Sequence, residues 1–244
     1  MLSKRKQKFS HTTPTPVDIL TGYAHWAESY QAAPHNPLME VEQQAMLSLM
    51  PVDLRDYTCL DVACGSGRYM LLLQARRAGQ VVGVDYSADM LAQAKKVDLG
   101  GQLIRGPFSP LPFPDNSFDL ISCGMAVGHE KNLAQVIGEL SRVLRFGGLL
   151  IYSDLHPFGA TAGWKRTFAA ANGTTYQLEH HFHTIDDHHA ACRQAGLKIE
   201  TILEPTLNPE SAPHPNPVVL VIKAVKSIPN PNPNPNLQSL TSNL

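Results

Sequence analysis

The stretch Thr58–Tyr69, which reads TCLDVACGSGRY, decides the fold. Its first residues are apolar and partly β-branched, as expected for a buried strand. Gly65 and Gly67 then allow a tight turn and leave no Cβ to block a ligand. Residues 68–77 follow with apolar side chains at helical spacing. The stretch therefore predicts a strand, a glycine turn and a helix whose free backbone N–H groups face a ligand.

An acidic residue ends the next predicted strand, which spans 80–84. Asp85 is placed there to accept hydrogen bonds from both ribose hydroxyls of a nucleoside. Dinucleotide-binding enzymes require a third glycine where this chain has Met70, which disfavours a nicotinamide dehydrogenase.

Residues 61–67, DVACGSG, resemble motif I of the class I S-adenosylmethionine-dependent methyltransferases. A second stretch, GPFSPLPFPDNSFDL at 106–120, is similar to this family's G-D-A-x-x-L-P-F-x-D-x-S-F-D. The resemblance covers roughly residues 20–225 and is strongest over 58–154. It implies S-adenosyl-L-methionine as the cofactor and an N-terminal helical segment that folds over it.

The resemblance also implies a set of cofactor-binding residues at the ends of successive strands. They are Asp61, Ala63, Cys64, Gly65, Ser66, Gly67, Asp85, Tyr86, Met90, Phe108 and Cys123. Met90 would lie over the adenine in this family, although a helical methionine also fits a plain core position. The family's acid after Gly106 is replaced by Pro107, so Phe108 is expected to stack on the base instead.

Two histidines follow the fourth and fifth strands at the carboxyl edge, where open α/β sheets bind ligands. They are His129 and His156, our candidates for a catalytic base or a residue that orients the substrate. His129 could equally cap the next helix. More histidines gather at 180–189, but no cysteine or acidic set completes a metal site, and we expect none. Arg166 alternates with Trp164 and Phe168, where it could pair with an anionic group of the acceptor.

The composition limits the choice of partners and location. The 244 residues carry 20 Lys and Arg against 21 Asp and Glu, so we expect no nucleic-acid partner. No apolar run approaches the ~18 residues of a membrane span, and residues 1–16 lack the apolar core of a secretory signal. The four cysteines form no C-x-x-C pair, which favours buried thiols in a reducing compartment, the cytoplasm. The oligomeric state stays open.

The alternation of strands and helices predicts an α/β fold: a doubly wound, mostly parallel, seven-stranded Rossmann-like sheet. N-terminal helices precede it, and a β-hairpin turning at Asn172–Gly173 is inserted after the fifth strand. Seven strands and an antiparallel last strand come from the family resemblance. The expected strands are 58–63, 80–84, 102–104, 118–123, 147–153, 197–203 and 218–225. We expect a disordered tail at 1–17, one domain at 18–226 and an Asn/Pro-rich tail at 227–244.

These features predict methyl transfer to a small-molecule acceptor by in-line displacement. The methylated atom, O, N or C, stays open, since only a protic acceptor needs a base. The alternative is a non-catalytic methyltransferase-like module that binds a partner protein, which the loss of the acid at Pro107 favours.

Overall fold

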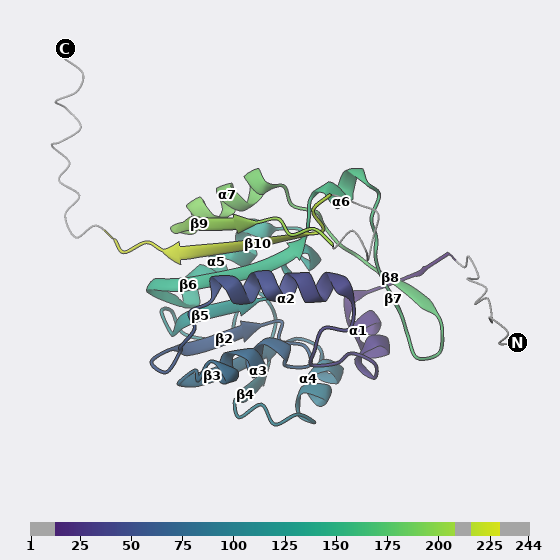
Figure 1. Ribbon diagram of the computed structural model, residues 1–244, viewed down its shortest axis with the longest axis horizontal. Coiled ribbons are helices and arrows are strands. Elements are labelled where there is room, and N and C mark those ends of the chain that lie inside the picture. Colours follow the sequence, from purple (N-terminus) through teal and green to yellow (C-terminus); the bar gives the residue numbers. More distant parts are fainter. Residues whose placement is uncertain (1–12, 208–215, 230–244) are drawn as a thin grey trace, which may run out of the picture.

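The computed structural model describes residues 13–207 and 216–229 (Figure 1). Its main sheet has seven strands in the order β4-β3-β2-β5-β6-β10-β9. They are β2 (Thr58–Val62), β3 (Gln80–Asp85), β4 (Gln102–Arg105), β5 (Phe118–Cys123), β6 (Leu144–Leu155), β9 (Leu197–Leu203) and β10 (Val219–Lys226). Strands β4, β3, β2, β5 and β6 pair in parallel, and β10 runs antiparallel to β6 and β9. The predicted mostly parallel, seven-stranded sheet is confirmed.

Helices cover both faces of this sheet because successive strand residues point to opposite sides. Helices α2 (Pro37–Leu49) and α3 (Arg68–Ala75) pack on one face, where Met46 and Met70 share a core with Cys59. Helices α5 (Leu133–Val143) and α7 (Ile185–Gln194) pack on the other, where Ile137 shares a core with Leu60. Both faces are therefore buried, which explains the nearly continuous apolar strands.

Local capping signals fix where several helices begin. Ser87 caps α4 (Ala88–Ala94) by accepting a hydrogen bond from the Met90 N–H at 3.2 Å. Thr184 and Asp187 form a capping box at the start of α7. Both caps were predicted. The short helices η1 (Val127–His129) and α6 (Phe158–Thr161) were not.

The predicted hairpin is present as β7 (Arg166–Ala169) and β8 (Thr175–Leu178), which pair antiparallel. Strand β1 (Thr15–Val17) adds to it in parallel, giving a second sheet in the order β1-β8-β7. Helix α1 (Ile19–Ala27) packs against this sheet, where Trp26 stacks on Phe168 with ring centroids 4.5 Å apart. In Figure 1, α1 and the hairpin gather at the end of the main sheet to which its parallel strands point.

The ends of the chain differ in part from expectation. The predicted tail at 1–17 is wrong for residues 15–17, which form β1 and gain backbone partners on β8. Pro16 has no N–H, which suits its place on the edge of this sheet. Residues 1–12 of that tail prediction lie outside the described residues, as do 230–244 of the Asn/Pro-rich segment. Within the described part of the chain, no helix has the length and apolar character needed to cross a bilayer.

Candidate active site

A cavity of ≈ 430 Å³ opens at the carboxyl ends of β2, β3 and β5. Four structural units form its walls: the loops after these strands, the 106–109 loop, α1 and the hairpin. The lining residues used below are Tyr23, Tyr30, Ala63, Gly65, Asp85, Tyr86, Met90, Pro107, Phe108, His129 and Arg166. The cavity therefore lies where the fold of an open α/β sheet places a ligand.

The β2–α3 loop and the end of β3 together form one wall of the cavity, and Asp85 joins them. The Gly65 N–H donates to Asp85 Oδ2 at 2.8 Å, and the Ser87 N–H donates to Asp85 Oδ1 at 2.8 Å. Burial raises the pKa of Asp85, opposed by these backbone hydrogen bonds. Each carboxylate oxygen keeps a lone pair, so Asp85 can still accept hydrogen bonds from a vicinal diol.

Gly65 has the left-handed backbone conformation, with φ +55°, and a Cβ there would meet nothing within 4 Å. The loop surface beside it is therefore open to a ligand that approaches the backbone.

Six predicted cofactor-binding residues line the cavity: Ala63, Gly65, Asp85, Tyr86, Met90 and Phe108. Pro107 lines it too, in the place of the acid that the resemblance leads one to expect. The Tyr86 side chain is exposed, whereas Met90 is buried. Aromatic and apolar side chains thus supply the part of the wall suited to a flat base.

The five other predicted residues do not line the cavity: Asp61, Cys64, Ser66, Gly67 and Cys123. All are buried. Asp61 Oδ1 accepts from the Ser122 hydroxyl at 2.8 Å, and burial raises the pKa of Asp61 to about 7. Asp61 Oδ2 and Ser66 Oγ have no hydrogen-bond partner among the described residues. Unsatisfied polar atoms beside a glycine loop are typical of a place where a ligand or water completes the bonding.

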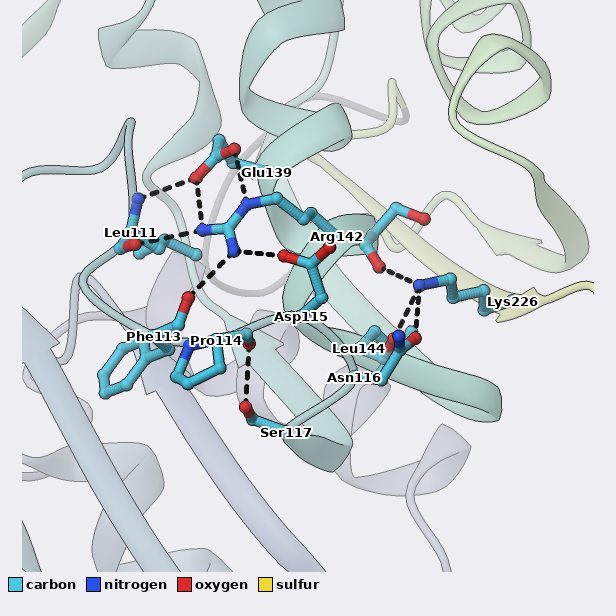
Figure 2. Close-up of polar contacts among 11 residues, drawn as sticks. Leu111, Phe113, Pro114, Asp115, Asn116, Ser117, Glu139, Arg142, Leu144 and Lys226 are labelled. Carbon is cyan, nitrogen blue, oxygen red and sulfur yellow. Dashed lines mark hydrogen bonds and ion pairs between the residues drawn. The ribbon is translucent and has the colours of Figure 1, made fainter.

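Arg142 on α5 holds the loop that follows Phe108 (Figure 2). Its guanidinium donates to both carboxylate oxygens of Glu139, to the carbonyls of Leu111 and Phe113, and to Asp115, at 2.8–3.0 Å. Five donor hydrogens thus meet five acceptors. This arrangement fixes residues 111–115 and so the position of the neighbouring aromatic wall.

Helix α1 forms part of the cavity wall. Tyr23 from this helix and Tyr30 just beyond it are among the lining residues. Both were missed as site residues. The available signal was the aromatic content of this N-terminal segment, but aromatic side chains in a helix usually indicate core packing.

His129, Tyr23 and Arg166 form a connected chain at the end of the cavity nearest the hairpin. Tyr23 Oη lies 2.8 Å from His129 Nε2, and Arg166 Nη2 donates to Tyr23 Oη at 3.2 Å. His129 Nδ1 lies 3.3 Å from the Glu179 carbonyl oxygen. Burial, together with the charge of Arg166, holds the pKa of His129 well below its usual range. His129 is therefore a neutral imidazole, and its surroundings disfavour the protonated form.

Asp154 is the counter-ion behind this chain. Its Oδ1 lies 3.9 Å from Arg166 Nη1 and accepts from the Leu155 N–H at 2.7 Å, and its Oδ2 accepts from the Gly128 N–H. His180 Nε2 lies 3.7 Å from Asp154 Oδ1. Burial raises the pKa of Asp154 to about 6.

His156 does not line the cavity, so the expectation that it faces the pocket is wrong. Its Nε2 lies 2.9 Å from Glu204 Oε1, and its Nδ1 accepts from the Phe158 N–H at 3.1 Å. The reason is local: β6 ends at Leu155, and the His156 N–H then bonds to the Val218 carbonyl at 3.1 Å. His156 thus accepts from the first N–H of α6, and its own N–H is bonded to the segment just before β10.

A buried charge network links α2 to the main sheet and was also missed. Glu42 is fully buried; it accepts from Arg68 at 2.8 Å, from the Tyr69 hydroxyl at 2.7 Å and from the Ser153 hydroxyl at 2.6 Å. In sequence, Glu42 is one of several polar residues of an amphipathic helix and gives no sign of burial. Among the described residues, no three His, Cys, Asp or Glu side chains are grouped so as to hold a metal ion.

Comparison with known proteins adds information on the central part of the chain. Residues 60–152 match the family described as "Methyltransferase domain". A demethylmenaquinone methyltransferase of Listeria welshimeri is 36% identical over 118 residues, which are 46% of this chain and 50% of that protein. An uncharacterised protein of Haemophilus influenzae is 34% identical over 142 residues, 53% of this chain and 55% of that protein. The chain thus spans about half the length of the curated relatives it matches.

Solved structures support the fold. An S-adenosylmethionine-dependent methyltransferase from Mesorhizobium loti matches with a TM-score of 0.65 at 22% identity, covering 76% of this chain and 97% of that one. A putative S-adenosylmethionine-dependent methyltransferase from Listeria monocytogenes matches with a TM-score of 0.67 at 19% identity, covering 78% and 100%. At these identities the likeness concerns the fold alone.

Proposed function

The chain belongs to the class I S-adenosylmethionine-dependent methyltransferases, and we propose that it transfers a methyl group from S-adenosyl-L-methionine to a small-molecule acceptor. The single observation that carries the proposal is the cavity that Gly65 and Asp85 line on one side and α1 lines on another. Such a cavity can hold a nucleoside and a second small molecule away from bulk water.

The residues present fit the cofactor. Asp85 has free lone pairs for the ribose hydroxyls, Phe108 and Met90 flank the place of the base, and Gly65 offers open backbone to the amino-acid end. The unpartnered Asp61 Oδ2 and Ser66 Oγ lie in the same glycine-loop region. Both atoms are buried and neither residue lines the cavity, so they do not contribute to this fit.

S-adenosyl-L-methionine, when bound, supplies a methyl group already attached to a positively charged leaving group. The protein therefore has mainly to orient the acceptor and exclude water. Tyr23 from α1, Tyr30 just beyond this helix and Arg166 from the hairpin line the cavity. For a protic acceptor, we propose that His129 orients the hydroxyl group, because it lies at the cavity; its lowered pKa makes the neutral imidazole a weak base.

The names of the relatives are the information that bears on the methyl acceptor. The names of several relatives refer to demethylmenaquinone, which suggests a ring compound with hydroxyl or carbonyl groups. The chain covers only about half of these relatives, so their names describe the acceptor of the relatives only.

Isothermal titration of the purified protein with S-adenosyl-L-methionine and with S-adenosylhomocysteine tests the proposal. We expect both to bind, and a screen of metabolites with the labelled cofactor should give one methylated product identified by mass spectrometry. If neither compound binds, the proposal is wrong. The second candidate, a non-catalytic binding module, would then remain, and it is supported by Pro107 at the cavity wall.

A further inference from the structure

The loop at residues 106–109 lies next to Asp85 and lines the cavity with all four of its residues. The Gly106 N–H donates to the Asp85 carbonyl oxygen at 3.1 Å, so the loop begins beside the end of β3. A nucleoside carries its base on the same small ring as its two hydroxyls. When Asp85 holds these hydroxyls, the base therefore lies near this loop. We call residues 84–87, Met90 and 106–109 the base wall.

Besides Asp85, the base wall offers only hydroxyl groups as polar side chains. They belong to Tyr86, Ser87 and Ser109. The hydroxyls of Ser87 and Ser109 already accept hydrogen bonds from within the protein, at 3.2 and 3.1 Å. A hydroxyl can donate or accept, so none of these groups requires a donor from the base. Pro107 has neither a polar side chain nor an N–H.

Water reaches the remaining acceptors near the base wall. Tyr86 is 54% exposed and Pro107 is exposed as well. In residues 84–90 and 106–109, no buried side-chain polar atom lacks a hydrogen-bond partner. Three other acids line the cavity and are exposed: Asp18, Glu130 and Glu179. A base without an amino group would thus leave no buried side-chain acceptor unpaired at this wall.

The place of the sugar differs from that of the base. Both carboxylate oxygens of Asp85 are held by backbone N–H groups, those of Gly65 and Ser87, at 2.8 Å each. A charged acceptor in a fixed position loses a strong hydrogen bond when a sugar hydroxyl is missing. A site discriminates strongly where such a polar group is left unpaired, and weakly where none is.

We propose that this site selects the ribose of its cofactor but not the exocyclic amino group of the base, and that Pro107 is the residue that determines this specificity. The inference rests on the proposed function and concerns the cofactor end of the same site. Contacts of Phe108 and Met90 with the base depend on its ring and not on the amino group. A carboxylate at position 107 would supply the acceptor that the base wall lacks.

The test compares three compounds by isothermal titration of the full-length protein. They are S-adenosylhomocysteine, its analogue with purine in place of adenine, which lacks only the amino group, and its 2′-deoxy analogue. We expect the purine analogue to bind with nearly the same dissociation constant as S-adenosylhomocysteine. The 2′-deoxy analogue should bind about tenfold or more weakly, because a hydrogen bond to a charged group is lost.

Pro107→Asp should create a preference for S-adenosylhomocysteine over the purine analogue of about tenfold. Pro114→Asp is the matched control, because Pro114 is exposed and does not line the cavity; its ratio of the two dissociation constants should equal that of the native protein.

The comparison in the native protein decides the proposal even if Pro107→Asp does not fold. If the native protein binds the purine analogue about tenfold more weakly than S-adenosylhomocysteine, the proposal is overturned. A folded Pro107→Asp variant without any preference would overturn the role of Pro107, and equal binding of the 2′-deoxy analogue would overturn the selection of the ribose. If S-adenosylhomocysteine itself does not bind, the proposed function fails instead.

Discussion

The Asp85 carboxylate accepts a hydrogen bond from the backbone N–H of Gly65 at 2.8 Å. The two residues follow neighbouring parallel strands, β2 and β3, so one contact joins the glycine loop to the acid at the sheet edge. A second hydrogen bond, from Ser87 to the other carboxylate oxygen, fixes the rotamer. Asp85 therefore both orders the loop and presents lone pairs to the cavity.

Asp85→Asn keeps the size of the side chain but removes the charge and one acceptor. We expect the dissociation constant of S-adenosylhomocysteine to rise about 10- to 100-fold, because hydrogen bonds to a charged group are lost. Isothermal titration measures it. Asp89→Asn, on an exposed position of α4, is the control and should bind as the native protein does. Equal affinities for the two variants would contradict this role of Asp85.

Much of the fold could be predicted because its signals are local. The buried strand at Thr58–Val62, the cap at Ser87 and the turn at Asn172–Gly173 each depend on residues adjacent in sequence. The positions of the glycine loop and of Asp85 could be predicted for the same reason, because each lies at the end of a strand.

The acceptor end could not be predicted in the same way, because its contacts join distant segments. Tyr23 meets His129 across 106 positions, and Arg166 meets Tyr23 across 143. Strand β1 forms only because β8 lies beside it. The His156 prediction failed since a position after a strand end does not say to which side the chain turns.

Arg142→Lys tests whether the network in Figure 2 positions the wall of the cavity. Lysine has three donors in place of five and cannot bind Glu139 in a bidentate manner. We expect the free energy of unfolding to fall by about 1–3 kcal/mol and the affinity for S-adenosylhomocysteine to fall severalfold, because the loop carrying Phe108 loosens. Urea denaturation and titration measure the two effects. Unchanged affinity would show that this loop does not depend on Arg142.

Glu42→Gln tests the buried network. The substitution leaves Arg68 buried without a charged partner, which typically costs about 3–5 kcal/mol of unfolding free energy. Urea denaturation measures the loss. Asp53→Asn, which removes the acid of an exposed ion pair with Arg55, is the control and should have a much smaller effect. A small loss in both variants would mean that the Glu42 charge is not needed for stability.

Asp61→Asn should change how stability depends on pH. Burial raises the pKa of Asp61 to about 7 from 3.8, so its contribution to stability is full below pH 3.8 and is lost as pH rises through 7. Asparagine does not titrate. The stability of the variant relative to the native protein should therefore increase by about 3 kcal/mol between pH 5 and pH 8. Urea denaturation at both pH values measures it, and a constant difference would contradict the burial of a titrating carboxyl here.

Gly128→Ala tests whether the packing around Gly128 is independent of the cavity wall formed by Gly65 and Asp85. A Cβ at Gly128 would overlap the ring of His180 and the carboxylate of Asp154, and Asp154 cannot move because two backbone N–H groups hold it. We expect a loss of about 1–3 kcal/mol of unfolding free energy from overpacking. Affinity for S-adenosylhomocysteine should stay unchanged, since Gly65 and Asp85 follow other strands.

Gly138→Ala is the matched control for this variant. Gly138 lies in α5, where a Cβ would meet nothing within 4 Å, so alanine should stabilise the helix by up to about 1 kcal/mol. Urea denaturation should show a lower free energy of unfolding for Gly128→Ala and a higher one for Gly138→Ala. This difference would separate the effect of local packing from that of helix propensity. If Gly128→Ala instead weakened the binding of S-adenosylhomocysteine as strongly as Asp85→Asn does, the packing around Gly128 and the wall formed by Gly65 and Asp85 would depend on each other.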